Sequence, residues 1–196
     1  GRGGPLYIVQ ARPETVQSRA DAGMLKSYRI REAGPVLSRG LAVGNGVASG
    51  RACLIESAAD IDDFVDGGVL VTHTTDPDWV PIMKRASAIV TDAGGRTSHA
   101  AIVSRELGLP AIVGTGDATH ELHDGQDITV DCTGGAEGLV HEGIASFDVE
   151  ETTLDDLPET QTQVMLNLAN PSAAALWWRL PARGVGLARM EFVVNN

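Results

Sequence analysis

Residues 88–113 read AIVTDAGGRTSHAAIVSRELGLPAIV, and this stretch decides the fold class. The β-branched run at 88–91 is typical of a buried strand. A helix is predicted over about 98–107, because Ser98 can cap its start and a Gly-Leu-Pro sequence stops it. A second strand-like run follows at 111–113. A strand, a turn, a helix and a strand in this order predict an α/β fold.

The same alternation extends from residue 35 to about residue 147. Further strands are predicted at residues 52–55, 69–72, 128–130 and 138–140, the last two as a hairpin around a glycine pair. A second helix is predicted over about 78–86, with Asp76 as its N-cap and Pro77 in its first turn. Residues 35–147 are therefore predicted to form one domain.

The two ends of the chain resemble parts of other folding units. A strand is predicted at 6–9, and a strand, a helix and a strand at 164–168, 173–180 and 184–187, as at the opening of a parallel α/β domain. Residues 148–159 hold six carboxylates and no base, which indicates an exposed linker. Because the sequence begins and ends inside such elements, we expect it to be a piece of a longer protein.

Charge and composition exclude several classes of partner. The net charge of −11 argues against nucleic acid and anionic membranes as partners. No apolar run approaches the roughly 18 residues of a membrane span, and no signal-peptide pattern opens the chain, so we expect a cytoplasmic protein. The charge is unevenly distributed along the chain. Residues 1–39 contain seven basic and three acidic residues, whereas residues 40–196 contain eight basic and twenty-three acidic residues.

Most candidate sites have a simple structural interpretation. His120 and His123 have metal-pair spacing but no third ligand nearby, so we interpret them as surface residues and expect no metal site. His73 and His141 are weaker candidates still. Cys53 and Cys132 lack a disulfide or zinc pattern and are interpreted as buried small hydrophobes. The glycines at 44, 46 and 50 do not fit a dinucleotide loop, and no Walker motif occurs.

His99 differs because of its place in the sequence. It follows a predicted strand and the Gly94-Gly95 pair, and Thr97 or Ser98 can cap the helix that starts there. The unpaired N–H groups of a helix N-terminus bind anions, and their field favours the neutral, nucleophilic ring. Arg96 adds a cation beside this position. From the residues alone, His99 is either a carrier of a phosphoryl group or a polar residue of a capping turn.

The motif TDAGGRTSHAAIVSRELGLPAIVG, residues 91–114, resembles the phosphohistidine signature of the phosphoenolpyruvate-utilising enzymes. Three further segments of that family have likenesses here, namely LYIVQARPETVQSR (6–19), TTDPDWVPIMKRASAIVTD (74–92) and GVGLARMEF (184–192). The resemblance covers essentially the whole chain.

The resemblance implies a division into domains. Residues 1–34 are expected to be the end of an ATP-grasp nucleotide-binding domain with a linker, and residues 35–147 a swivelling β/β/α phosphohistidine domain. Residues 148–160 are expected to be a linker. Residues 161–196 are expected to begin a TIM barrel that binds phosphoenolpyruvate and pyruvate.

The resemblance also implies a reaction. His99 would take the β-phosphoryl group of ATP, by way of a pyrophosphorylated form, and pass it to pyruvate. The overall reaction is ATP, pyruvate and water to AMP, phosphoenolpyruvate and phosphate, with Mg²⁺ bound by parts of the enzyme outside this chain. The alternatives are pyruvate phosphate dikinase, the first enzyme of the sugar phosphotransferase system, and a binding module without catalysis.

Individual residues acquire roles from the same likeness. His99 matches the phosphohistidine, and Arg189 matches an arginine that grips phosphoenolpyruvate or pyruvate in the barrel. Thr97 matches a threonine that a regulatory kinase phosphorylates and a phosphatase restores in several members. The remaining residues of the motif are expected to support the phosphoryl group: Gly94, Gly95, Arg96 and Ser98.

Overall fold

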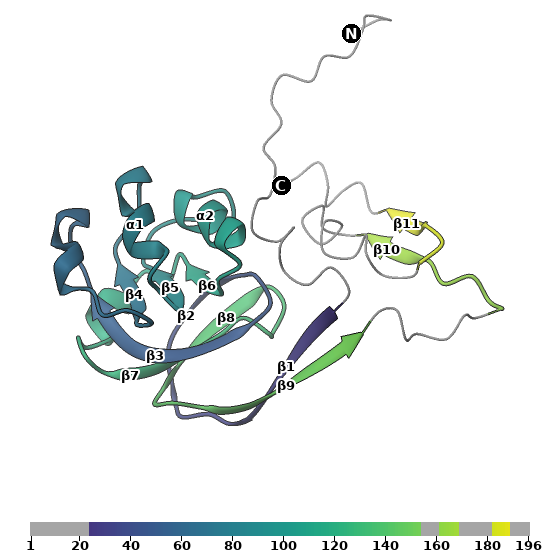
Figure 1. Cartoon of the computed structure of the whole chain (residues 1–196), viewed down its shortest axis with the longest axis horizontal. Helices are drawn as coiled ribbons and strands as arrows, with labels where there is room; N and C mark the ends of the chain where they lie inside the picture. Colours follow the sequence, from purple (N-terminus) through teal and green to yellow (C-terminus); the bar gives the residue numbers. More distant parts are fainter. Residues whose placement is uncertain (1–23, 154–160, 169–181, 189–196) are drawn as a thin grey trace, which may run out of the picture. The chain divides into compact units, whose positions relative to one another are not determined.

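The computed structural model of the chain describes residues 24–153, 161–168 and 182–188 (Figure 1). Contacts divide the chain into two compact units, one of which includes residues 28–149. The other includes the described residues at 24–27 and from 150 onward. The strand predicted at 6–9, the helix predicted at 173–180 and Arg189 lie outside the described residues.

Seven strands of the first unit form a closed barrel in the order β2-β6-β5-β4-β3-β7-β8. The strands β3, β4, β5 and β6 are parallel neighbours, and the remaining pairs are antiparallel. The predicted α/β class is therefore confirmed, whereas closure of the sheet was not predicted. The bounds are β2 Val36–Val43, β3 Val47–Leu54, β4 Val69–Thr72, β5 Ala88–Thr91, β6 Ala111–Val113, β7 Asp127–Asp131 and β8 Glu137–Glu142.

The helices of this unit are short. They are the 3-10 turns η1 (Ala58–Asp63) and η2 (Pro77–Trp79) and the helices α1 (Val80–Met83), α2 (His99–Leu107) and α3 (Ala118–Glu121). Figure 1 shows α1 and α2 on the same side of β4, β5 and β6. No helix in the described ranges is long and apolar enough to cross a membrane.

The helix predicted over 78–86 is present only in part, since it opens as the 3-10 turn η2 and continues as the four-residue helix α1. The Asp76 carboxylate accepts the amide N–H of Asp78 at 2.9 Å, which confirms the predicted cap. The α-helix ends at Met83, after which the amides of Arg85 and Ala86 donate to carbonyls only three residues back, those of Ile82 and Met83. Arg85 donates to the carbonyls of Ile61 and Phe64, and the Ser87 amide donates to the carbonyl of Gly68 at 2.9 Å.

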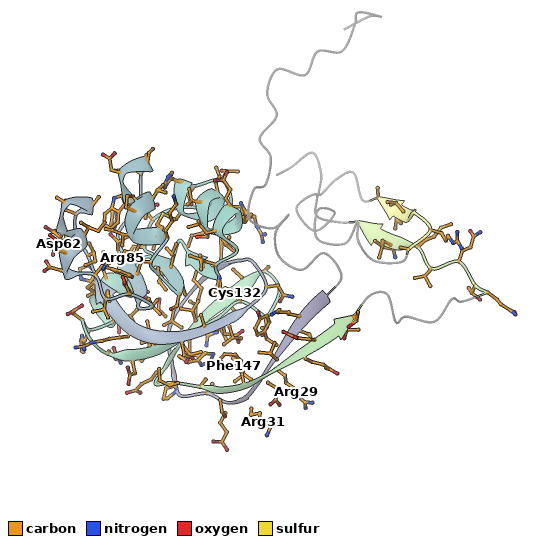
Figure 2. All side chains as sticks on the ribbon, in the orientation of Figure 1. Arg29, Arg31, Asp62, Arg85, Cys132 and Phe147 are labelled. Atoms are coloured by element: carbon orange, nitrogen blue, oxygen red, sulfur yellow. The ribbon has the colours of Figure 1, made fainter. Side chains whose placement is uncertain are left out.

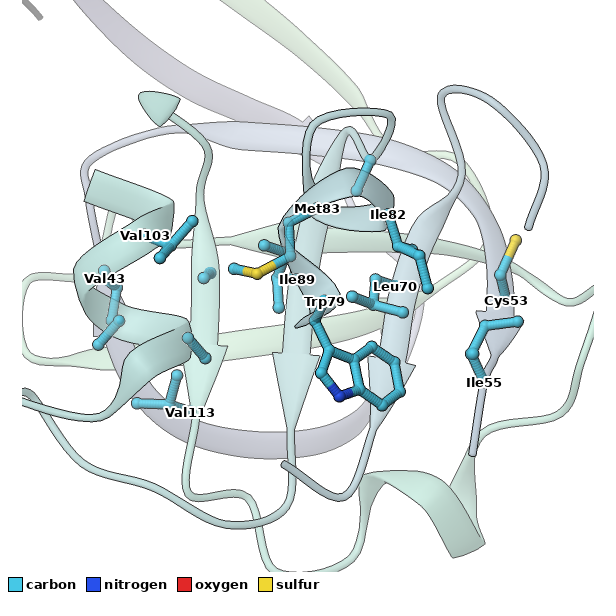
Figure 3. Close-up of a cluster of buried hydrophobic side chains, with 14 of the residues drawn as sticks. Val43, Cys53, Ile55, Leu70, Trp79, Ile82, Met83, Ile89, Val103 and Val113 are labelled. Carbon is cyan, nitrogen blue, oxygen red and sulfur yellow. The ribbon is translucent and has the colours of Figure 1, made fainter. Parts of the chain in front are cut away.

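The strands β4, β5 and β6 are buried on both faces, which explains their continuous apolar runs. Leu70 and Ile89 face α1 and α2, where they pack with Trp79 and Met83 (Figure 3). The alternate residues of the same strands fill the barrel interior around Ile112. The interior is so close-packed that a Cβ on Gly138 would lie 2.7 Å from the Ile112 side chain. Tight packing on both sides holds the ends of β4, β5 and β6 in fixed positions.

The strands β1 (Met24–Glu32) and β9 (Ser146–Thr153) pair as a two-stranded sheet. Arg31 Nε lies 2.5 Å from Asp148 Oδ2, and Lys26 Nζ lies 2.8 Å from Glu151 Oε1. Figure 2 shows Arg31 on β1 and Phe147 on β9. Residues 148–153, expected to be a linker, are exposed but form a strand, because β1 supplies the opposite charges and the strand partner that the acidic run lacks by itself.

In the second unit, β10 (Leu166–Leu168) pairs with β11 (Val185–Ala188) in parallel. These strands confirm the two predicted at 164–168 and 184–187. Parallel pairing requires a crossover between the strands, as the predicted order of strand, helix and strand implies.

Candidate functional site around His99

Three loops meet where β4, β5 and β6 end. Because these strands are parallel neighbours in register, with Thr72 beside Thr91 and Thr91 beside Val113, their carboxyl ends lie at one edge of the barrel. The amide of Ala93 donates to the carbonyl of His73 at 2.8 Å, and the amide of Thr115 donates to the carbonyl of Thr91 at 3.1 Å. Functional sites of parallel sheets lie at such carboxyl ends.

His99 lies at this edge as the first residue of α2, and its side chain is half-buried. Its Nδ1 atom lies 2.9 Å from Oγ1 of Thr75, which is buried in the loop after β4. A hydroxyl can accept a hydrogen bond from Nδ1–H, and in that tautomer Nε2 carries the lone pair. With Nδ1 engaged by Thr75, Nε2 is the nitrogen available to a phosphoryl group.

The N-terminus of α2 is capped by Ser98. Its Oγ accepts the amide N–H of Ala101 at 3.4 Å, and its backbone is extended, as at an N-cap. Thr97 is exposed. Of the two predicted caps, the structure therefore selects Ser98, which leaves the Thr97 hydroxyl at the surface two residues before His99.

The glycine turn before His99 is held by close backbone packing. Gly94 has φ of 117°, and a Cβ there would lie 2.8 Å from the Oγ atom of Ser98. Gly114 has φ of 71°, and a Cβ there would lie 2.6 Å from the carbonyl oxygen of Gly94. Positive φ and these approaches restrict both positions to glycine. A Cβ on Gly95 would meet nothing within 4 Å, so the backbone is open there.

The side chain of Arg105 binds the backbone of Arg96 in the glycine turn. Arg105 lies in the last turn of α2, and its Nη1 atom donates to the carbonyl of Arg96 at 2.8 Å. This bond ties the turn to the body of the helix. The Arg96 side chain is half-buried, and its contact with a phosphoryl group stays a prediction.

Asp92, immediately after β5, was not predicted as a site residue. Its side chain is 5% exposed, and its Oδ1 atom accepts Thr115 Oγ1–H and Thr119 N–H, each at 3.1 Å. Oδ2 accepts the Thr119 hydroxyl and lies 3.7 Å from His73 Nδ1. Burial raises the pKa of Asp92, but the hydrogen bonds from Thr119 and Thr115, together with the nearby His73 ring, outweigh burial, so its pKa lies below the ordinary value. Asp92 is therefore a buried anion at neutral pH.

Sequence reasoning also missed Thr75. Thr75 comes just before the Asp-Pro pair at the start of η2, and Asp92 comes just before the glycine turn. Both residues follow runs that were predicted as strands, so polar residues at strand ends were the available signal. That signal becomes specific only once the strands are known to be parallel neighbours.

The remaining candidate residues make no contact with His99 among the described interactions. His120 and His123 are exposed, as interpreted, and the described residues contain no group of three or more metal-ligating side chains. His141 is buried, and its Nδ1 atom lies 3.0 Å from the Gly34 carbonyl oxygen. Cys53 and Cys132 are buried free thiols, which confirms their interpretation.

Comparison with known proteins identifies the family. Residues 64–135 match the family described as PEP-utilising enzyme, mobile domain. The whole chain is 50% identical to a phosphoenolpyruvate synthase of Synechocystis sp. and covers 24% of that protein. It is also 50% identical to a phosphoenolpyruvate synthase of Pseudomonas aeruginosa and covers 25% of it. The chain thus spans about a quarter of the length of these curated relatives.

A solution structure of an Enzyme I protein is 33% identical over 41% of this chain and 33% of the other, with a TM-score of 0.35. The family match covers β4, β5, α2 and β6 and contains His99, Thr75 and Asp92. The family match over residues 64–135 shows that the chain carries the mobile domain of the phosphoenolpyruvate-utilising enzymes.

Proposed function

We propose that the chain is the phosphocarrier part of an enzyme that converts ATP, pyruvate and water to AMP, phosphoenolpyruvate and phosphate. The observation that carries the proposal is the 2.9 Å contact between Thr75 Oγ1 and His99 Nδ1. A histidine held by one nitrogen at a helix N-terminus presents its other nitrogen to an anion, as a phosphoryl carrier must. The similarity of the whole chain to about a quarter of the length of phosphoenolpyruvate synthases supports the choice of reaction.

The proposed chemistry uses Nε2 of His99 as the nucleophile. Nε2 attacks the β-phosphorus of ATP and forms an N–P bond. The bond between that phosphorus and the oxygen that bridges to the α-phosphorus breaks, and AMP leaves. Water then cleaves the terminal phosphoryl group and releases phosphate. Finally, pyruvate gives up a methyl proton to a base, the oxygen of the resulting enolate takes the remaining phosphoryl group, and the electron pair of the N–P bond returns to Nε2. Nδ1 keeps its proton and its contact with Thr75 throughout.

The residues around His99 have supporting roles in this proposal. The N–H groups at the start of α2 and the open backbone at Gly95 would receive phosphoryl oxygens. Arg96 would add a positive charge, and Gly94 would hold the turn against Ser98. Thr97, which is exposed, would be the residue on which a regulatory kinase and phosphatase act. Arg189 would bind phosphoenolpyruvate or pyruvate.

We propose the domain plan that the resemblance implies. Residues 35–147 would be a swivelling phosphohistidine domain that moves between an ATP-grasp domain, which ends in residues 1–34, and a TIM barrel, which begins in residues 161–196. These domains of the same polypeptide would be its partners. The fact that the chain spans about a quarter of its relatives' length supports the plan.

Mg²⁺ is the metal ion that the family implies. The described residues contain no cluster of His, Cys, Asp or Glu that could hold an ion, so they do not fit a resident Mg²⁺ site. In this proposal Mg²⁺ is bound by parts of the enzyme outside this chain, where it would neutralise charge on the phosphates of ATP.

Replacement of His99 tests the proposal. In the complete enzyme, His99→Ala is expected to abolish AMP formation from ATP, with or without pyruvate, while the protein stays folded. His123→Ala is the matched control, because His123 is an exposed histidine outside the site. Parent-like AMP formation by a folded His99→Ala enzyme would exclude His99 as the carrier. Equal loss of activity in both variants would also contradict the proposal.

A further inference from the structure

Asp92 connects the loops that meet at the site. Its amide donates to the carbonyl of Thr72 at 3.2 Å, and its carbonyl accepts the amide of Gly116 at 3.0 Å. Its carboxylate accepts two hydrogen bonds from Thr119 and one from Thr115. The backbone and side chain of Asp92 therefore hold the ends of β4 and β5, the turn after β6 and the start of α3 in one arrangement.

A chain of contacts leads from this carboxylate to His99. Asp92 holds Thr115, and Gly114 before it is packed so closely on the Gly94 carbonyl that a Cβ would lie 2.6 Å from its oxygen. Gly94 in turn packs against the Oγ atom of Ser98, the residue before His99. A shift of the Asp92 partners would consequently move the glycine turn and the first residue of α2.

Burial of a carboxylate at this edge is unfavourable for anion binding in itself. Asp92 is ionised and almost fully buried, and the proposed ligand is a phosphoryl group that carries negative charge. The hydrogen bonds to both oxygens of Asp92 offset the cost of burying its charge. The same bonds hold the loops together.

Asp131 provides a comparison within the same barrel. Its carboxylate accepts Thr133 N–H at 2.8 Å and Thr133 Oγ1–H at 2.7 Å, and it lies 4.0 Å from His141 Nε2. Asp131 thus also combines a threonine and a histidine around a carboxylate that is 13% exposed. It ends β7, next to Cys132, whose Sγ atom donates to the carbonyl of Ala111 at the amino end of β6. Asp131 is therefore at the other end of the parallel strands from His99.

We propose that Asp92 is a positioning residue for phosphoryl transfer, whose carboxylate fixes the glycine turn and through it the position of Nε2 of His99. This inference rests on the proposed function. Asp131 has the same kind of contacts without the connection to His99, so it holds the barrel but not the site.

The test compares four variants of the complete enzyme: Asp92→Ala, Asp92→Asn, Asp131→Ala and Asp131→Asn. A single-turnover experiment measures the rate of AMP formation from ATP without pyruvate, and its dependence on ATP concentration separates KM from the rate at saturation. All rates are measured well below the melting temperature of each variant, so that differences in stability do not change the folded fraction.

Asp92→Ala is expected to slow the step about 100-fold, the order of loss that a displacement of about 1 Å causes. KM for ATP is expected to change less than about twofold, because this proposal places the ATP site on another domain. Asp92→Asn is expected to lose only about tenfold, since its amide oxygen still accepts from Thr115 and Thr119. Both Asp131 variants are expected to lower the melting temperature while they keep the parent rate.

A folded Asp92→Ala enzyme with the parent rate would overturn the inference, as would equal loss of rate in the Asp92 and Asp131 variants. If Asp92→Ala fails to fold, Thr119→Val replaces it, because it removes the hydroxyl bond to Asp92 Oδ2 and keeps the N–H bond to Oδ1. A parent rate in folded Thr119→Val would then overturn the inference. A parent enzyme that forms no phosphohistidine contradicts the proposed function itself, whereas a phosphorylated parent with unaffected Asp92 variants contradicts only this inference.

Discussion

The hydroxyl of Thr75 lies 2.9 Å from Nδ1 of His99, although 24 residues separate them in the sequence. The contact exists because β4 and β5 are parallel neighbours, so that the loops that follow them meet at one edge of the barrel. Thr75 is 8% exposed, so water competes little for its hydroxyl. The contact engages Nδ1 of His99, so in the proposed function Nε2 would be the ring nitrogen that receives the phosphoryl group.

Removal of the Thr75 hydroxyl is expected to slow phosphorylation of His99. Thr75→Val keeps the side-chain volume but lets the ring rotate and exchange its tautomer, so we expect a loss of about tenfold in the rate of AMP formation. Thr75→Ser restores the hydroxyl and is expected to recover most of the rate. Equal rates in the Val and Ser variants would show that the hydroxyl does not orient His99.

Gly114→Ala is expected to disturb the glycine turn without direct contact with His99. A Cβ at position 114 would lie 2.6 Å from the Gly94 carbonyl oxygen, so the turn must move. Gly116→Ala is the control, because Gly116 also has a positive φ, 82°, but a Cβ there would meet nothing within 4 Å. Both variants share backbone strain of roughly 1 kcal/mol or more, and only Gly114→Ala adds the clash.

The measurements are the melting temperature and the rate of AMP formation in the complete enzyme. We expect similar losses of melting temperature from strain, with a further loss of both stability and rate in Gly114→Ala. A Gly116→Ala enzyme that loses as much rate as Gly114→Ala would show that contact with Gly94 does not position the turn.

Thr97→Glu is expected to abolish turnover, whereas Thr97→Val is expected to retain most of it. A carboxylate two residues before His99 would occupy the N–H groups at the start of α2 and repel the incoming phosphoryl group. Valine removes only an exposed hydroxyl, and the cap is unaffected because Ser98 supplies it. AMP release from ATP, with and without pyruvate, distinguishes the variants. Parent-like activity of Thr97→Glu would place Thr97 away from the phosphoryl site.

The buried thiol of Cys132 is expected to make the folded state less stable at alkaline pH. Burial raises the pKa of its thiol from 9.0 to about 12. Above pH 9 the unfolded chain releases this proton and the folded chain retains it, so the free energy of unfolding falls by up to about 1.4 kcal/mol per pH unit from this group. Urea unfolding at pH 8 and pH 10.5 is expected to show a smaller fall in Cys132→Ala than in the parent. The same fall in both proteins would contradict burial of the thiol in an apolar site.

Much of the fold could be predicted because local signals were strong. The runs at 69–72, 88–91 and 111–113 coincide with β4, β5 and β6, and Ser98 and Gly108 bound α2 as caps. Closure of the barrel could not be predicted, because apolar runs do not show which strands pair. The strand β9 was missed because its charges are satisfied by Lys26 and Arg31, which are far away in the sequence.

Only part of the candidate site could be predicted from the sequence. One continuous motif contains His99, the glycine turn and the capping serine, so neighbouring residues suffice to predict the start of the helix and the place of His99. Thr75, Asp92 and Thr119 contribute through contacts between separate loops, and those contacts depend on the parallel order of β4, β5 and β6. A polar residue after a strand indicates a site only when the neighbouring strands are known.

The most direct test of the account is to locate the phosphoryl group. The complete enzyme is incubated with ATP labelled in its β-phosphoryl group, without pyruvate, and the labelled peptide is identified after digestion under alkaline conditions. The account predicts an acid-labile, alkali-stable label on His99 that disappears when pyruvate is added and appears in phosphoenolpyruvate. A label on another residue, or turnover without any labelled His99, would contradict it.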